Sequence, residues 1–154
     1  MANTLRWVAV LGGARIPFAR ANGAYLEAGN QGMLTAAMTA LVDKFDLKKQ
    51  KLGEVAAGAV IKHSRDFNLV RESVLSSGLA PETPGLDVQR ACGTGLSAAI
   101  IVGSKISTCL IEAGIAGGTD SISDVPLVYP EAYRELLLES ARGRTFGARL
   151  RPWL

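Results

Sequence analysis

The sequence has few of the residues on which several classes of protein depend. It contains only two cysteines, Cys92 and Cys109, too few for a disulfide framework, which fits a reducing compartment. Aromatic residues make up 6% of the chain and do not alternate with a basic stripe, so we expect no nucleic-acid partner. The uncharged run around Cys92, residues 91–104, has 14 residues, fewer than the roughly 20 that a membrane span needs. The N-terminus shows no basic head before a long apolar run, so no secretory signal is expected. These absences favour a soluble, cytoplasmic protein.

What is present is enough apolar sequence to form a folded core. The 154 residues are 48% hydrophobic and 20% charged, which excludes disorder and favours one domain. The net charge of +3 is small, and the Arg-rich stretch after residue 130 is interpreted as solvated surface. We expect the chain to divide into a domain of residues 1–128 and a tail of residues 129–154. In that tail, residues 131–141 predict an amphipathic helix, and residues 142–154 show no periodicity and are expected to be poorly ordered.

Strand-like and helix-like segments alternate along the first 116 residues. The strands are predicted at 5–11, 54–61, 84–88 and 113–116, and the helices at 30–45, 69–75 and 92–110. Asp66 is a plausible N-cap for the second helix, and Gly78 is its expected stop. This alternation predicts an α/β fold with a mostly parallel sheet and helices on both faces. The third helix is apolar on most sides and is therefore expected to be buried and central.

Cys92 is the candidate functional residue that local context singles out. It falls on the predicted turn between the strand at 84–88 and the third helix, where free backbone N–H groups favour negative charge. A thiol placed there is a better nucleophile, and Gly93 and Gly95 leave room beside it for a substrate. The alternative is a buried structural cysteine. Cys109 lies 17 residues further on, roughly 25 Å along the same helix, so the two cannot form a disulfide within one chain.

Three segments in order resemble the thiolase family of acetyl-CoA acetyltransferases and 3-ketoacyl-CoA thiolases. Arg90-Ala91-Cys92-Gly93-Thr94-Gly95-Leu96 is similar to the nucleophile motif of that family. Val8-Ala9-Val10-Leu11-Gly12-Gly13-Ala14-Arg15-Ile16-Pro17-Phe18 is similar to its opening strand and Arg-x-Pro turn. Ala116-Gly117-Gly118-Thr119-Asp120-Ser121-Ile122-Ser123 is similar to its Gly-Gly-x-Glu-Ser-Met-Ser loop, with Asp120 in place of Glu and Ile122 in place of Met. The resemblance covers about residues 5–128 and implies the N-terminal half of a thiolase.

The resemblance implies an acyltransferase that works through a covalent thioester on Cys92. The expected reaction is Claisen condensation or thiolytic cleavage of a 3-ketoacyl-CoA in fatty acid metabolism, with acyl-CoA and CoA as substrates. It implies neither a bound cofactor nor a metal, and it implies a homo-oligomer. Cys92 would supply both the sulfur and an oxyanion N–H, while Gly93 and Gly95 shape the turn. Gly117 and Gly118 would form a loop facing Cys92.

The catalytic base that the family uses is missing from these residues. Family members take a histidine from a Gly-His-Pro motif and a second cysteine from Cys-x-Gly-Gly-Gly, and neither motif occurs here. The one histidine, His63, is interpreted as a surface or loop-capping residue, and Cys109 lies at the wrong end of the helix. We therefore expect a fragment that is inactive or nearly so. The alternatives are a non-catalytic dimerisation or interaction module derived from a thiolase and, third, a relative of the 3-ketoacyl synthases.

Overall fold

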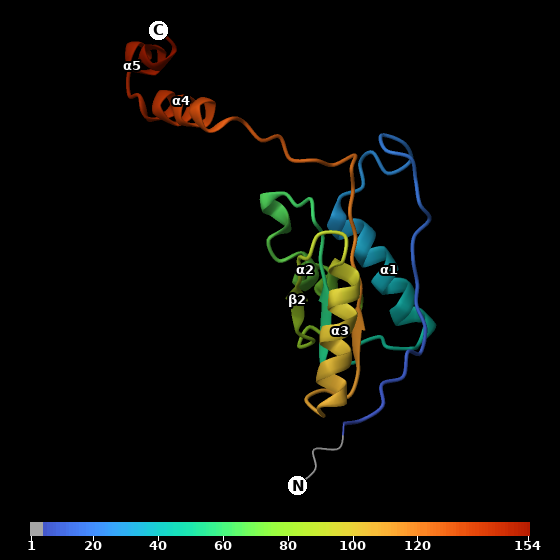
Figure 1. Cartoon of the computed structure of the whole chain (residues 1–154). Coiled ribbons are helices and arrows are strands. Elements are labelled where there is room, and N and C mark those ends of the chain that lie inside the picture. Colours follow the sequence, from blue (N-terminus) through green and yellow to red (C-terminus); the bar gives the residue numbers. More distant parts are fainter. Residues whose placement is uncertain (1–4) are drawn as a thin grey trace.

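A three-stranded parallel sheet lies between the first three helices of the chain (Figure 1). The computed structural model describes residues 5–154. The strands are β1 (Glu54–Ala57), β2 (Gly85–Asp87) and β3 (Gly114–Ala116), in the order β2-β1-β3. Both ladders are parallel, with Val55 opposite Gly85 on one side and opposite Ile115 on the other.

Successive residues of β1 pack against helices on opposite faces of the sheet, because side chains alternate along a strand. Val55, Ala57 and the following Ala59 pack in one core cluster with α1 (Asn30–Lys44) and α2 (Leu69–Ser76). Ala56 packs on the other face with Ala98 and Val102 of α3 (Thr94–Ser107). This arrangement confirms the α/β fold with a parallel sheet and helices on both faces.

The entry into α2 differs from the sequence prediction. Asp66 is not the N-cap of this helix: it ends a separate 3-10 turn, η1 (Ser64–Asp66), and accepts a hydrogen bond from the N–H of His63 at 3.1 Å. The helix begins three residues later, after Asn68. The predicted stop is confirmed, because Gly78 follows the last helical turn with a φ of +88°, a value that favours glycine.

The first predicted strand is absent. Residues 5–11 form no ladder with any strand within residues 5–154, and Trp7 and Val10 are almost fully exposed. The segment is attached through Arg6, whose side chain donates hydrogen bonds to the carbonyl oxygens of Ile106 and Ile111 at 3.2 and 3.1 Å. An apolar sequence forms a strand only where a neighbouring edge accepts its backbone hydrogen bonds, and the described residues place none beside it.

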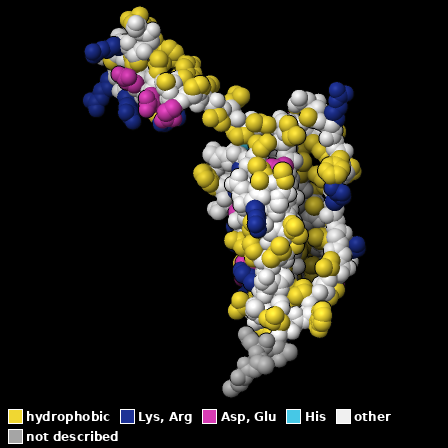
Figure 2. Space-filling view, in the orientation of Figure 1, with side chains coloured by type: hydrophobic (Ala, Val, Ile, Leu, Met, Phe, Trp, Pro, Cys, Tyr) yellow, Lys and Arg dark blue, Asp and Glu magenta, His cyan; other side chains and the backbone are white. Residues whose placement is uncertain are grey.

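Helix α3 is shorter and less buried than the sequence predicts. It begins at Thr94 and ends at Ser107 rather than running from 92 to 110, and Cys109 lies beyond its end with a φ of +62°. Ala98 and Val102 are buried, but Leu96 and Ile100 on the outward face are 70% and 57% exposed. The expectation of a helix buried on most sides is thus met on one side only. Figure 2 shows hydrophobic side chains on the face of the molecule that carries α3.

The last residues form a small helical unit that projects away from the sheet (Figure 1). It consists of α4 (Glu131–Arg142), α5 (Phe146–Leu150) and the 3-10 turn η2 (Arg151–Trp153). Edge-to-face aromatic contacts hold it together: the ring centroids of Tyr129 and Tyr133 are 5.1 Å apart, and those of Tyr133 and Trp153 are 6.0 Å apart. The amphipathic helix predicted at 131–141 is present. Residues 142–154 contain α5 and η2 where the sequence showed no periodicity, while the domain division at residue 128 stays a prediction.

No helix within residues 5–154 combines the length and apolarity needed to cross a bilayer.

Candidate active site

Cys92 lies on the turn between β2 and α3, where the sequence predicts it. The helix begins two residues later, at Thr94, and the thiol is exposed rather than packed in the core. The backbone N–H of Cys92 donates no hydrogen bond within residues 5–154. A sulfur in this position can attack a carbonyl carbon, and the unengaged N–H of the same residue can then donate a hydrogen bond to the oxyanion that forms.

The backbone of this turn adopts a conformation that non-glycine residues rarely take. Ala91, directly before Cys92, has a φ of +44°. The buried hydroxyl of Thr94 accepts a hydrogen bond from the N–H of Arg90 and donates one to the carbonyl oxygen of Ala91, each at 2.8 Å. Gly93 closes the same turn by donating its N–H to the carbonyl oxygen of Arg90 at 2.9 Å. Strained strand-to-helix turns of this kind present nucleophiles in other enzyme folds.

A hollow of about 400 Å³ opens beside Cys92 at the carboxyl ends of the strands. This is the edge at which open parallel sheets bind their ligands. The residues that line it come from the loops after all three strands and from the start of α3: Gly58, Ala91, Cys92, Thr94, Gly95, Gly117, Gly118, Thr119 and Asp120. The structure therefore brings Gly95, Gly117 and Gly118 together with Cys92, whereas Gly93 shapes the turn from outside the lining.

Glycine is needed where the loops behind the hollow approach one another closely. A Cβ atom on Gly58 would lie 1.8 Å from the carbonyl oxygen of Val88, and one on Gly118 would lie 3.2 Å from the carbonyl oxygen of Gly58. Hydrogen bonds keep these loops in contact, because the N–H of Thr119 donates to the carbonyl oxygen of Gly58 at 3.0 Å. Sequence reasoning missed Gly58, because it placed this glycine inside a strand predicted at 54–61, whereas β1 ends at Ala57. A lone glycine in a sequence does not reveal which backbone lies against it.

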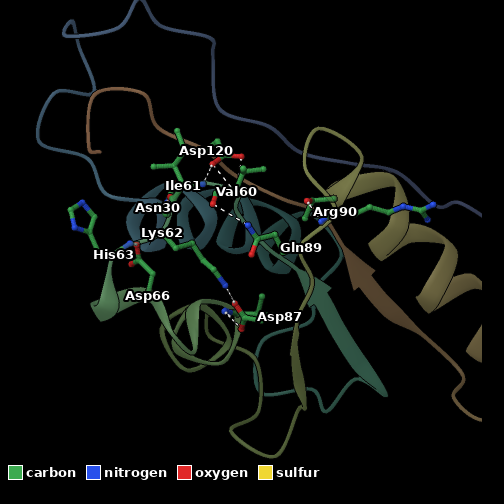
Figure 3. Close-up of polar contacts among 12 residues, drawn as sticks. Asn30, Val60, Ile61, Lys62, His63, Asp66, Asp87, Gln89, Arg90 and Asp120 are labelled. Atoms are coloured by element: carbon green, nitrogen blue, oxygen red, sulfur yellow. Dashed lines mark hydrogen bonds and ion pairs between the residues drawn. The ribbon is translucent and has the colours of Figure 1, made fainter. Parts of the chain in front are cut away.

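Asp120 ties the loop after β3 to the loop after β1 (Figure 3). Its carboxylate accepts hydrogen bonds from the N–H groups of Val60 and Ile61 at 3.0 and 2.9 Å. Gln89, from the loop after β2, donates its side-chain amide to the carbonyl oxygen of Val60 at 3.3 Å. The sequence identified Asp120 only as part of a motif. The structure shows what its carboxylate does, which is to fix one wall of the hollow.

The single histidine lies outside the hollow. The ring of His63 is 3.0 Å from a carboxylate oxygen of Asp124, and Arg65 also binds this carboxylate. The hydrogen bond from Arg65 is the largest cause of the lowered pKa of Asp124, and the positive charge of Arg65 adds to it. This position agrees with the interpretation of His63 as a loop residue rather than a base for Cys92.

Cys109 is also remote from the hollow, because it follows the far end of α3 and does not line it. Among residues 5–154, no three His, Cys, Asp or Glu side chains are grouped so as to hold a metal ion.

Comparison with known proteins places this fold and turn among the thiolases. A family model described as "Thiolase, N-terminal domain" matches residues 8–146. The 3-ketoacyl-CoA thiolase of Photorhabdus laumondii is 31% identical over 144 residues, which are 94% of this chain and 33% of that protein. The 3-ketoacyl-CoA thiolase of Shewanella oneidensis is 32% identical over 143 residues, again 33% of its length. The crystal structure of the Bacillus anthracis acetyl-CoA acetyltransferase superposes with a TM-score of 0.78 at 22% identity, over 84% of this chain and 33% of that one.

The chain thus spans about a third of the length of these relatives. Because the family model matches most of the chain, including all three strands and the Cys92 turn, the chain belongs to the thiolase family and corresponds to its N-terminal domain.

Proposed function

We propose that this chain carries the nucleophile of a thiolase-type acyltransferase and that Cys92 is that nucleophile. The Cys92 sulfur attacks the carbonyl carbon of an acyl-CoA thioester. A bond forms between that carbon and the Cys92 sulfur, and the bond to the CoA sulfur breaks. CoA leaves as the free thiol after taking up a proton equivalent to the one that Cys92 gave up. The products are an acyl thioester on Cys92 and CoA, with no oxidation or reduction.

The observation that carries this proposal is the exposed thiol at the mouth of a hollow that the three loops build around it. The unengaged N–H of Cys92 supports its second role as an oxyanion donor. Gly95, Gly117 and Gly118 are proposed to admit the thioester because they bring no side chains into the hollow, while Gly93 keeps the turn. The names of the relatives support a 3-ketoacyl-CoA or acetyl-CoA as the thioester.

A complete catalytic cycle needs a base that these residues do not place beside Cys92. No imidazole lines the hollow within residues 5–154, and the Asp120 carboxylate already accepts two backbone hydrogen bonds. We therefore propose that the 154-residue chain accepts an acyl group on Cys92 but turns over very slowly. A full thiolytic or condensing cycle would require groups from other parts of a longer polypeptide, in a homo-oligomer of the thiolase type.

Brief incubation with acetyl-CoA followed by peptide mass spectrometry tests the proposal. We expect one acetyl group on Cys92, removable by neutral hydroxylamine as a thioester is, and no acetyl group on Cys109. Cys109 is a matched internal control because it is also an exposed free thiol. The Cys92→Ala variant should lose the adduct. A chain that remains unmodified at Cys92, or is modified equally at both cysteines, would contradict the proposed nucleophile. Thiolytic cleavage of a 3-ketoacyl-CoA at the rate of a complete thiolase would contradict the proposed slow turnover.

A second candidate function, a non-catalytic interaction module, is favoured by the open outward face of α3. Leu96 and Ile100 on this face are more than half exposed, an unusual position for large apolar side chains in one row of a helix. Under this alternative the chain pairs with a thiolase subunit or with itself, and its Cys92 has no chemical role. A chain that pairs stably but takes no acetyl group from acetyl-CoA would favour the module over the enzyme.

A further inference from the structure

We infer that Thr94 is a positioning residue whose hydroxyl holds the Cys92 turn in its strained, attack-ready form. This inference rests on the proposed function of Cys92 and adds a specific side chain on which that function depends. Thr94 is the first residue of α3, and its backbone alone would serve to begin the helix. Its side-chain hydroxyl has a further role, because it forms hydrogen bonds with the preceding turn and not with the helix.

The Thr94 hydroxyl forms hydrogen bonds on both sides of the positive φ of Ala91, one with Arg90 and one with Ala91 itself. The N–H of Arg90 donates to the Thr94 hydroxyl oxygen, and the hydroxyl donates in turn to the carbonyl oxygen of Ala91. Within residues 5–154, the N–H of Arg90 has no other hydrogen-bond acceptor than this hydroxyl. The carbonyl of Ala91 also receives the N–H of Thr94 at 3.2 Å, so it keeps one partner without the hydroxyl.

The Thr94 side chain is itself fixed by packing. It is 5% exposed, and its methyl carbon lies against Gly58, where an added Cβ would come within 3.2 Å of it. The β-branched side chain therefore has little freedom to turn its hydroxyl away from the peptide. The same packing joins the Cys92 turn to the loop after β1, so one residue sets both the turn and its distance from the facing wall.

Removing the hydroxyl leaves the N–H of Arg90 without its acceptor and removes one of the two bonds that hold Ala91 at a φ of +44°. The turn can then relax toward an ordinary negative φ, which rotates the peptide that carries Cys92. A sulfur moved off its position in the hollow attacks an electrophile more slowly, although it is still exposed. The effect is on orientation, since Thr94 itself touches no reacting atom in the proposed chemistry.

The test compares the rates at which iodoacetamide alkylates Cys92 and Cys109 in the full chain, followed by peptide mass spectrometry. In Thr94→Val, which keeps the shape and loses the hydroxyl, we expect the Cys92 rate to fall about tenfold, the size of effect expected when the hydrogen bonds of one hydroxyl group are lost. Thr94→Ser should restore most of that rate. The Cys109 rate should not change in either variant, because Cys109 follows the opposite end of α3.

Glycine at position 91 provides a second, independent test. Ala91→Gly removes the steric cost of a positive φ, so in the Thr94→Val background it should recover part of the lost Cys92 rate. If Thr94→Val does not fold, as judged by circular dichroism, the Cys92 rate of the double variant Ala91→Gly/Thr94→Val is compared instead with that of Ala91→Gly alone.

The outcomes separate this inference from the proposed function. If Cys92 reacts no faster than Cys109 in the unmodified chain, the nucleophile itself is refuted. If Cys92 reacts faster but Thr94→Val leaves its rate unchanged, or Thr94→Ser fails to restore it, the role of the Thr94 hydroxyl is refuted while Cys92 stands. An equal change in the rates at Cys92 and Cys109 would mean that the substitution acts on the whole chain and not on the Cys92 turn, and it would also overturn the positioning role.

Discussion

Replacing Gly58 by alanine should destabilise the chain by about 3 kcal/mol. The new Cβ would lie 1.8 Å from the carbonyl oxygen of Val88, whereas real Cβ contacts essentially never fall below 3.0 Å, so one backbone must move by more than 1 Å. Overpacking of a buried site costs about 1–3 kcal/mol. The shift would also strain the hydrogen bond from the N–H of Val88 to the carbonyl oxygen of Ala57, now 2.8 Å long, at a further cost of about 1 kcal/mol.

Urea unfolding followed by circular dichroism measures this loss, and Gly103→Ala is the matched control. Gly103 lies within α3, and a Cβ there would meet no atom within 4 Å. The same substitution should therefore stabilise the chain by up to about 1 kcal/mol, because alanine is the better helix former. A Gly58→Ala variant within about 0.5 kcal/mol of the unmodified chain would refute the close approach of the loops after β1 and β2.

Two further predictions concern charge and surface. Arg65 holds the pKa of Asp124 below its ordinary 3.8, so this pairing stabilises the fold above about pH 4 and is lost as the pH falls through the lowered pKa. Asp124→Asn should therefore lower the free energy of unfolding at neutral pH and have little effect near pH 2; a difference that is constant with pH in urea titrations would count against the pairing. Ile100→Glu, on the outward face of α3, should reduce concentration-dependent self-association in sedimentation experiments and leave stability within about 0.5 kcal/mol. The control Val102→Glu, at a buried position of the same helix, should instead unfold the chain. Self-association that Ile100→Glu leaves unchanged would contradict a role of the outward face of α3 in pairing.

The sequence was most informative where a pattern is local. The spacing of apolar residues predicted α1 from Asn30, and Gly78 marked the end of α2 because only a residue tolerant of positive φ suits that position. Alternating strands and helices predicted a parallel sheet with two covered faces. The motif around Cys92 predicted both the turn and the family, since its glycines and its cysteine are adjacent in the chain.

Tertiary structure decided what depends on neighbours far along the chain. Residues 5–11 have the composition of a strand, yet they join no ladder in the part of the chain that the structure describes, because a strand exists only where another edge meets it, and composition does not say whether one will. Helix α3 is apolar on most sides in sequence, but it buries only the side that the sheet covers. The sequence by itself determined where the turn that carries Cys92 lies. The resemblance already implied that Gly117 and Gly118 face Cys92, but only the fold brought Gly58 and the Asp120 carboxylate beside that turn, because loops that follow parallel strands meet in space however distant they are in sequence.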